Sequence, residues 1–290
     1  MLPFLKFLAE QYLEEKLIMY NQGKRYGQIV FLAGGAGSGK GFAISNFMEK
    51  EKFKIRDVDE WKKAFLFLAD TTNEYPEIAG LKLRNPQDVQ KLHAFVRDKG
   101  IKSKTLDLLL KDVNTKHLPN IMFDITMKDA TDIGEALPKL LEVGYNPRNI
   151  HLTWVLTNYA IAIVNNRNRA RVVPEDIMLL SHEGAAASMY KVIKGKLPRG
   201  LNGGVRVILN NRENSIPWID PDTREVMKDH KSGNVMVRDF TYLTFKKEGK
   251  SIAPEMDVKR QLLSWIADNV PKTKLTMDMT GIDSDGEINE

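Results

Sequence analysis

Short apolar runs alternate along this chain with longer segments in which apolar positions recur every three or four residues. The short runs predict buried strands, and the longer segments predict amphipathic helices. The predicted strands are residues 28–33, 53–58, 120–126, 150–156 and 205–209. Strands that alternate with helices form mainly parallel sheets covered by helices on both faces. The pattern therefore predicts an α/β fold, a three-layer sandwich with a mainly parallel central sheet.

Helical spacing fills the segments between these strands. The helix after Asn85 is the clearest, because Pro86 suits a first turn and the apolar residues that follow share one face. Helices are expected over residues 42–50, 60–70, 85–99, 103–113, 133–143, 158–166, 174–195 and 254–269. Beyond residue 212 the pattern changes to a hairpin over 216–228 and a further β segment over 235–245.

These elements predict four parts of the chain. Residues 1–25 are expected to form an amphipathic N-terminal helix rather than a leader, and residues 26–211 the core. Within the core we expect an insertion over about 71–113 and a lid over about 165–175. Residues 212–271 are expected to form a β/α extension, and the polar residues 272–290 a disordered tail.

The first predicted strand runs into a glycine-rich loop and then a helix, with the spacing Gly34-x4-Gly39-Lys40. This is the P-loop pattern, in which backbone N–H groups surround phosphate oxygens and the lysine adds a positive charge. A glycine-rich turn that only packs a helix on a strand is the alternative interpretation. We expect the loop to bind the phosphates of ATP through Gly35, Ala36, Gly37, Ser38, Gly39, Lys40 and Gly41. Gly41 stands where the pattern has a Ser or Thr hydroxyl for Mg²⁺.

Carboxylates follow two further predicted strands, at the edge of the sheet where ligands bind in such folds. Asp59 is our choice for the base that activates an acceptor hydroxyl, although an Asp here could also cap the helix that follows. Asp57 is the second candidate. Asp124 is either a ligand of metal or acceptor, or a satisfied buried carboxylate. In place of the missing hydroxyl, we expect Asp124 and Ser38 to help hold Mg²⁺.

Three arginines, Arg167, Arg169 and Arg171, follow the fourth predicted strand and its helix. Guanidinium groups pair with phosphate oxygens and stabilise the charge of phosphoryl transfer, so we expect a mobile arginine lid. A solvated basic helix face is the alternative. Arg167 and Arg171 are assigned to catalysis and Arg169 to nucleotide binding. His182 is interpreted as structural or as lining the acceptor site.

The composition is that of an ordinary globular protein, with 42% hydrophobic and 28% charged residues. Without cysteine, disulfides and thiolate metal sites are excluded, and a reducing cytoplasm is the expected location. A net charge of +5 favours an anionic partner such as nucleic acid. No apolar run reaches the roughly 20 residues of a membrane span, so no membrane partner is expected. The oligomeric state is not indicated.

The order of these motifs resembles polynucleotide 5′-kinases and zeta-toxin-type kinases. After the second strand those families have an acid, an aromatic and a basic residue, which Asp59, Trp61 and Lys62 match. The resemblance covers about residues 28–193 and implies that the acid is the base for the acceptor hydroxyl. We expect an acceptor site lined by Asp57, Trp61, Lys62 and Asp124.

Residues 81–86, 149–156 and 172–175 are also similar to phage-encoded P-loop kinases of thymidine hypermodification. Those enzymes phosphorylate 5-hydroxymethyluracil in DNA, which implies ATP and DNA with a modified base as partners, in the cytoplasm of a host cell. A polynucleotide 5′-hydroxyl kinase and a nucleotide-sugar kinase of the zeta-toxin type remain open. An ATPase or nucleotide switch without a phosphoryl acceptor is an alternative of another class.

Overall fold

The structure is a computed structural model, and it describes residues 26–48, 50–72, 74–211, 215–228, 236–251 and 256–280. The predicted N-terminal helix over residues 1–25 lies outside the described residues, as do residues 281–290. None of the helices in the described part is both long and apolar enough to cross a bilayer.

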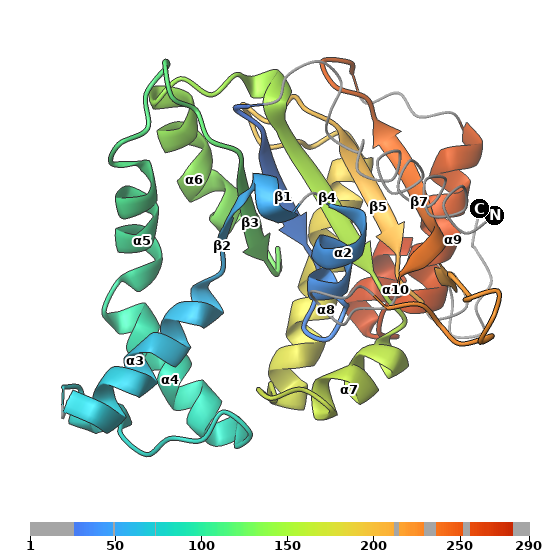
Figure 1. The fold of residues 1–290 in the computed structure, drawn as a ribbon. Helices are drawn as coiled ribbons and strands as arrows, with labels where there is room; N and C mark the ends of the chain where they lie inside the picture. The colour runs from blue at the N-terminus through green and yellow to red at the C-terminus, as the bar shows by residue number, and fades with distance from the viewer. Residues whose placement is uncertain are drawn as a thin grey trace.

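A seven-stranded sheet forms the centre of the molecule, in the order β2-β3-β1-β4-β5-β7-β6 (Figure 1). Its strands are β1 (Ile29–Ala33), β2 (Lys54–Arg56), β3 (Ile121–Ile125), β4 (Ile150–Leu156), β5 (Val205–Leu209), β6 (Ser215–Pro217) and β7 (Val237–Lys246). The first five strands are parallel, and β7 and β6 pair antiparallel at one edge. In this register Ala33, at the end of β1, lies beside Ile125 and Trp154, so the loops after β1, β3 and β4 leave the sheet side by side.

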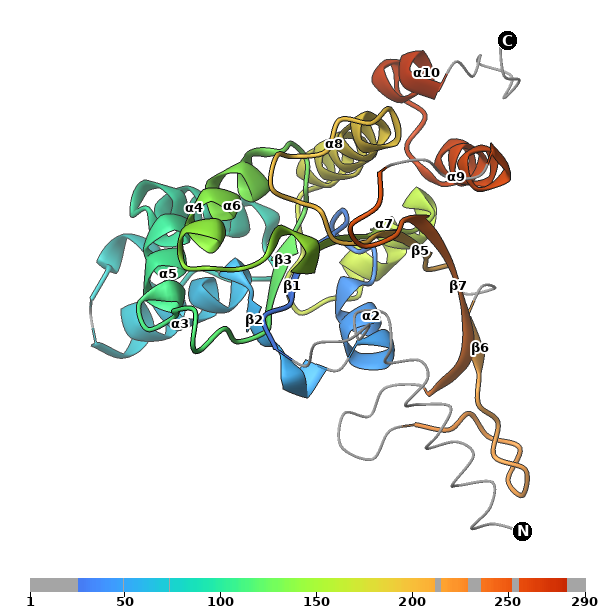
Figure 2. The ribbon, with the colours of Figure 1, turned by 90° about the horizontal axis from the view of Figure 1, so that it is seen from above.

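Alternate residues of β1 pack on opposite faces of the sheet, as the period of a strand requires. Phe31 packs with the helices α6 (Thr131–Glu142), α8 (Glu175–Ile193) and α9 (Met256–Asn269). Leu32 packs with α2 (Lys40–Phe47) on the other face. Figure 2 shows α6 and α8 on one side of the sheet and α2 on the opposite side. The predicted three layers are confirmed.

A helical lobe extends beyond the β2 edge of the sheet (Figure 1). It contains α3 (Val58–Thr72), α4 (Pro86–Asp98) and α5 (Ile101–Leu110), which bury a small apolar cluster of their own. Asn85 caps α4 by accepting from the N–H groups of Gln87 and Asp88, and Pro86 is the first residue of the helix.

The segment that carries Arg169 and Arg171 connects α7 (Tyr159–Arg167), whose last residue is the first of the three arginines, to α8. The buried Asn166 side chain fixes one end of it, donating to Val173 O at 2.8 Å and accepting from Val173 N at 3.0 Å. The next residue back, Val172, donates its N–H to Leu83 O at 3.0 Å, so the segment touches the helical lobe.

The prediction of a disordered tail from residue 272 is wrong for α10 (Lys274–Thr280), which packs near α8. Thr273 and Thr276 close its first turn reciprocally, each N–H donating to the other hydroxyl at 3.0 and 3.3 Å. The Thr273 hydroxyl also donates to the Glu183 carboxylate on α8. These contacts order a polar segment whose sequence lacks the apolar periodicity that would predict a helix.

Candidate functional site

The glycine-rich loop connects β1 to α2, as the P-loop motif predicts. Lys40 is the first residue of α2, and its ammonium donates to Gly34 O at 2.6 Å. The same ammonium lies 3.6 Å from Asp124 Oδ1 at the end of β3. The Ser38 hydroxyl is buried and has no hydrogen-bond partner in the described part of the chain. A buried hydroxyl without a partner is costly, so this loop is suited to receive a ligand.

Two asparagine side chains hold the loop by donating hydrogen bonds to its carbonyl oxygens. Asn210, directly after β5, donates to Ser38 O at 2.9 Å, and Asn165 of α7 donates to Gly37 O at 3.2 Å. Gly39 has a φ of 85°, and a Cβ there would lie 2.0 Å from Asn210 Nδ2. Only glycine satisfies both the left-handed backbone and the close approach of Asn210.

The α8 helix holds the tip of the loop at a single residue, Ala36. The Ala36 N–H donates to Ser181 Oγ at 3.2 Å, and His182 Nε2 lies 2.7 Å from Ala36 O. A Cβ on Gly35 would lie 2.3 Å from the His182 ring. Burial lowers the pKa of His182 to about 4, although the bond to Ala36 opposes that shift. At neutral pH the ring is uncharged and donates from Nε2. His182 is therefore structural, the first of its two predicted interpretations.

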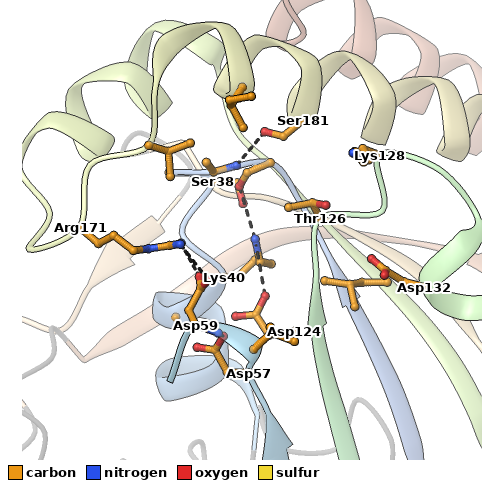
Figure 3. Close-up of a pocket in the computed structure, with 18 of the residues that line it drawn as sticks. Ser38, Lys40, Asp57, Asp59, Asp124, Thr126, Lys128, Asp132, Arg171 and Ser181 are labelled. Atoms are coloured by element: carbon orange, nitrogen blue, oxygen red, sulfur yellow. Dashed lines mark hydrogen bonds and ion pairs between the residues drawn. The ribbon is translucent and has the colours of Figure 1, made fainter. Parts of the chain in front are cut away.

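The carboxylates after β2 have different roles in the local fold. Asp57 caps α3, because its Oδ1 accepts from Asp59 N at 2.7 Å. The predicted alternative, that Asp59 is the cap, is wrong since α3 begins at Val58 and Asp59 lies in the first turn. The Asp59 carboxylate instead accepts from Arg171 Nη1 and Lys62 Nζ, both at 2.8 Å, and Arg171 Nη2 contacts its second oxygen (Figure 3).

The pKa values of the three aspartates diverge for physical reasons. Burial would raise the pKa of Asp59, but Arg171 and Lys62 outweigh burial and lower it. Burial raises the pKa of Asp57 and also that of Asp124, where the charge of Lys40 opposes the shift. Asp59 is therefore the carboxylate held ionised. In the described residues no three His, Asp or Glu side chains converge closely enough to hold a metal by themselves.

The three arginines do not share one environment. The Arg171 side chain is 14% exposed and points at Asp59 (Figure 3). Arg169 lines the same cavity, where burial and the charge of Arg171 lower its pKa. Arg167 is 65% exposed and pairs with Glu175 at 2.6 Å, outside the cavity. The structure therefore does not place Arg167 in the predicted site, because the last turn of α7 directs its side chain to solvent.

Helix geometry also separates the residues of the acid-aromatic-basic motif, because Trp61 lies on a different face of α3 from Asp59 and Lys62. Lys62 lies three residues after Asp59 on one face of α3 and lines the cavity. Trp61 falls on a different face, is 38% exposed and is not among the residues that line the cavity. The structure therefore does not place Trp61 in the predicted acceptor site.

The loop, the three aspartates and the two inward arginines all line one cavity of about 1900 Å³. The predicted fold class, an α/β three-layer sandwich with a mainly parallel central sheet, is confirmed. The parallel strands deliver the loop from β1 and carboxylates from the ends of β2 and β3 to one edge of the sheet.

No protein-family model and no curated protein sequence matches the chain. A structure from the PezAT chromosomal toxin–antitoxin system of Streptococcus pneumoniae is 15% identical, with a TM-score of 0.41 over 72% of this chain and 78% of that chain. The complex AvrRxo1-ORF1:AvrRxo1-ORF2 with sulphate ions is 10% identical, with a TM-score of 0.48 over 96% and 82%. Deoxyadenosine kinase from M. mycoides with bound dATP is 14% identical, with a TM-score of 0.34 over 68% and 95%.

The residues that support the loop were not predicted from the sequence. Asn210 could have been found, because it follows a parallel strand at the same edge as Asp57 and Asp124. Asn165 and Ser181 lie within helices and carry no motif. Their roles become visible only when α7 and α8 are placed against the loop.

Proposed function

We propose that this protein is a kinase that transfers the γ-phosphoryl group of ATP to a hydroxyl acceptor. The observation that carries this proposal is that Lys40, Asp59 and Arg171 line one cavity beside the glycine-rich loop. A phosphate-binding loop with a lysine, an ionised carboxylate and an inward arginine are the groups that phosphoryl transfer requires.

In the proposed step the acceptor oxygen forms a bond to the γ-phosphorus as the bond from that phosphorus to the ADP oxygen breaks. Asp59 takes the proton of the acceptor hydroxyl, because its neighbours keep it ionised at neutral pH. Lys40 and Arg171 stabilise the negative charge on the transferred group. The amides of the loop and of the first turn of α2 position the phosphates.

The contacts of Asp59 also suggest an order of events. Arg171 contacts both oxygens of Asp59, and Lys62 shares one of them. A γ-phosphate competes for the same guanidinium, since arginine pairs bidentately with phosphate as well as with carboxylate. ATP would draw Arg171 away from Asp59 and leave a carboxylate oxygen free for the hydroxyl proton.

The chemistry around the loop fits a magnesium ion that accompanies ATP. Asp124 and the unpartnered Ser38 hydroxyl are oxygen donors of the kind Mg²⁺ accepts, and they would hold it in place of the hydroxyl absent at Gly41. When bound, the ion would neutralise part of the charge on the phosphates.

The most specific acceptor that we propose is the 5-hydroxymethyl group of hydroxymethyluracil in DNA. The support is the net charge of +5 and the similarity in sequence to the kinases of thymidine hypermodification. A base inside a duplex cannot reach Asp59, so such an acceptor would have to be unpaired or turned out of the stack.

The test is transfer of label from γ-labelled ATP with Mg²⁺ to hydroxymethyluracil DNA, a 5′-hydroxyl oligonucleotide or UDP-N-acetylglucosamine. Label inside DNA only when hydroxymethyluracil is present supports the specific proposal, and label on another acceptor supports kinase activity alone. Free phosphate with no labelled acceptor contradicts both. Asp59→Asn should lower turnover about 10²- to 10⁴-fold while ATP binding is kept. Glu60→Gln, the exposed neighbour on α3, is the matched control and should be neutral.

A further inference from the structure

The cavity extends well beyond the glycine-rich loop. Sites for a single small ligand occupy roughly 300–1000 Å³, and this cavity of about 1900 Å³ has room for a second ligand. Its far half is lined by the helical lobe on one side and by the loop after β3 with α8 on the other. The far half includes Gln90, His93, Arg97, Lys128, Ile177 and Leu180.

Lys128 is the cation of this half that forms no ion pair within the described part of the chain, and its charge acts on the exposed neighbouring carboxylate of Asp129. Lys102 contacts Asp132 and lies 3.6 Å from Glu135, and Lys139 contacts Asp107. Lys128 makes no ion pair or hydrogen bond with any other residue that the structure describes. Figure 3 draws it on the opposite side of Lys40 from Arg171.

A strained backbone places Lys128 there. Met127, the residue before it, has a φ of 56° although its side chain is fully buried in the core. Left-handed backbone is unfavourable for such a residue and persists only where surrounding packing enforces it, typically near functional sites. The Lys128 carbonyl is pressed against Gly184 of α8, where a Cβ would lie 2.4 Å from it. Met127 and Gly184 together turn the chain so that Lys128 projects over the cavity.

The opposite wall is also basic. Arg97 and His93 lie one turn apart on α4, and among the described residues Arg97 forms an ion pair only with its exposed neighbour Asp98. Burial and the charges of Lys62, Arg97 and Lys128 lower the pKa of His93, and the charge of Asp59 opposes them, so these groups act on the same space. The His93 ring is therefore uncharged at neutral pH and offers a phosphate a hydrogen bond, while Arg97 supplies the positive charge of this wall. The exposed apolar side chains of Ile177 and Leu180 complete the lining.

We propose that the far half of the cavity binds a nucleotide as the acceptor, with the phosphate of that nucleotide held by Lys128 facing Arg97 and His93. An apolar wall beside a basic one matches a ligand with a flat, weakly polar base and an anionic phosphate. This inference rests on the proposed kinase function and adds that an acceptor without its own phosphate binds poorly. The nucleotide can be free or part of a single strand.

Binding tests this assignment independently of transfer. With the site saturated by a non-hydrolysable ATP analogue and Mg²⁺, calorimetry compares 5-hydroxymethyldeoxyuridine, its 5′-monophosphate and a short single strand that contains it. The phosphate should strengthen binding at least about 10-fold. Lys128→Gln should remove that gain and Lys128→Arg should restore it. Lys111→Ala, an exposed lysine outside the cavity, should leave the gain unchanged. Tighter binding of the strand than of the monophosphate identifies the polymer as the source.

The inference is overturned by equal affinity for nucleoside and nucleotide, by no binding of either, or by an unchanged phosphate gain in Lys128→Gln. Weaker binding of the ATP analogue in Lys128→Gln also overturns it, because the lysine then serves ATP. Failure of this inference and failure of the kinase proposal give different experimental results. Phosphate-dependent binding without label transfer keeps this site and removes the kinase, whereas equal transfer to nucleoside and nucleotide keeps the kinase and removes this site.

Discussion

The contact between Gly35 and His182 provides the sharpest test of how the phosphate loop is held. Gly35 does not have left-handed backbone, so an alanine there meets no conformational penalty. Its Cβ would nevertheless lie 2.3 to 2.5 Å from three atoms of the His182 ring. The ring cannot move aside without losing its 2.7 Å contact with Ala36 O. Gly35→Ala therefore tests the α8 contact and little else.

The expected magnitudes follow from this geometry. Overpacking of one methyl group costs about 1–3 kcal/mol of the free energy of unfolding. His182→Ala removes the ring and leaves the Ala36 carbonyl without its partner, which costs about 1–3 kcal/mol for the carbonyl alone. In the double variant the clash disappears, so its cost should be close to that of His182→Ala. The predicted coupling between the two substitutions is about 1–3 kcal/mol and favourable.

Urea denaturation of the wild type, both single variants and the double variant measures this coupling. Gly41→Ala is the matched control, because a Cβ at Gly41 has no atom within 4 Å, and it should not be destabilising. Gly35→Ala should also weaken binding of an ATP analogue, since the tip of the loop must shift. Additive effects, with a coupling below about 0.5 kcal/mol, would refute the contact as described.

Three further outcomes are expected. Arg171→Ala should lower turnover about 10³-fold or more, whereas Arg167→Ala should stay within about twofold because its side chain is solvated; equal losses in steady-state rates would contradict this assignment. Gly41→Thr should lower the Mg²⁺ concentration that half-saturates binding of an ATP analogue, and no change would show that position 41 does not reach the ion. The pKa of His182 falls from about 6.5 in the unfolded chain to about 4, so the unfolded state binds more protons between these values. The free energy of unfolding should then fall by up to about 3 kcal/mol from pH 6.5 to pH 4, and denaturation curves of His182→Gln should show a shallower decline.

Much of the fold could be predicted because the central strands β1 and β4 are buried at every residue. All residues of β4 are buried, and its bounds match the predicted run over 150–156. The α8 helix was predicted from helical spacing along the sequence together with Pro174, which precedes it. By contrast α10 has no apolar stripe, and the hydroxyls of Thr273 and Thr276 order it through contacts that no periodicity records.

The residues of the site also differ in how well they could be predicted from the sequence. Residues at strand ends could be predicted, since the ends of parallel strands converge whatever the helices do. The three arginines could not be separated from the sequence, because the exact end of α7 decides which of them faces the cavity. Trp61 was misplaced for a related reason: a motif fixes spacing, but the start of α3 at Val58 fixes which face each residue takes.

The contacts of α7 and α8 limit how far the proposed lid, the segment between Arg167 and Val173, could move. Both helices are bound to the tip of the loop by three hydrogen bonds, so moving either helix would cost roughly 0.5–1.5 kcal/mol for each bond and expose the apolar cluster beneath them. Asn166 fixes Val173 at the far end. The segment between them is held mainly by the Arg171–Asp59 pair and one hydrogen bond to the helical lobe. Phosphate can replace the first of these directly, and so closure over ATP requires a change in about five residues while both helices stay in place.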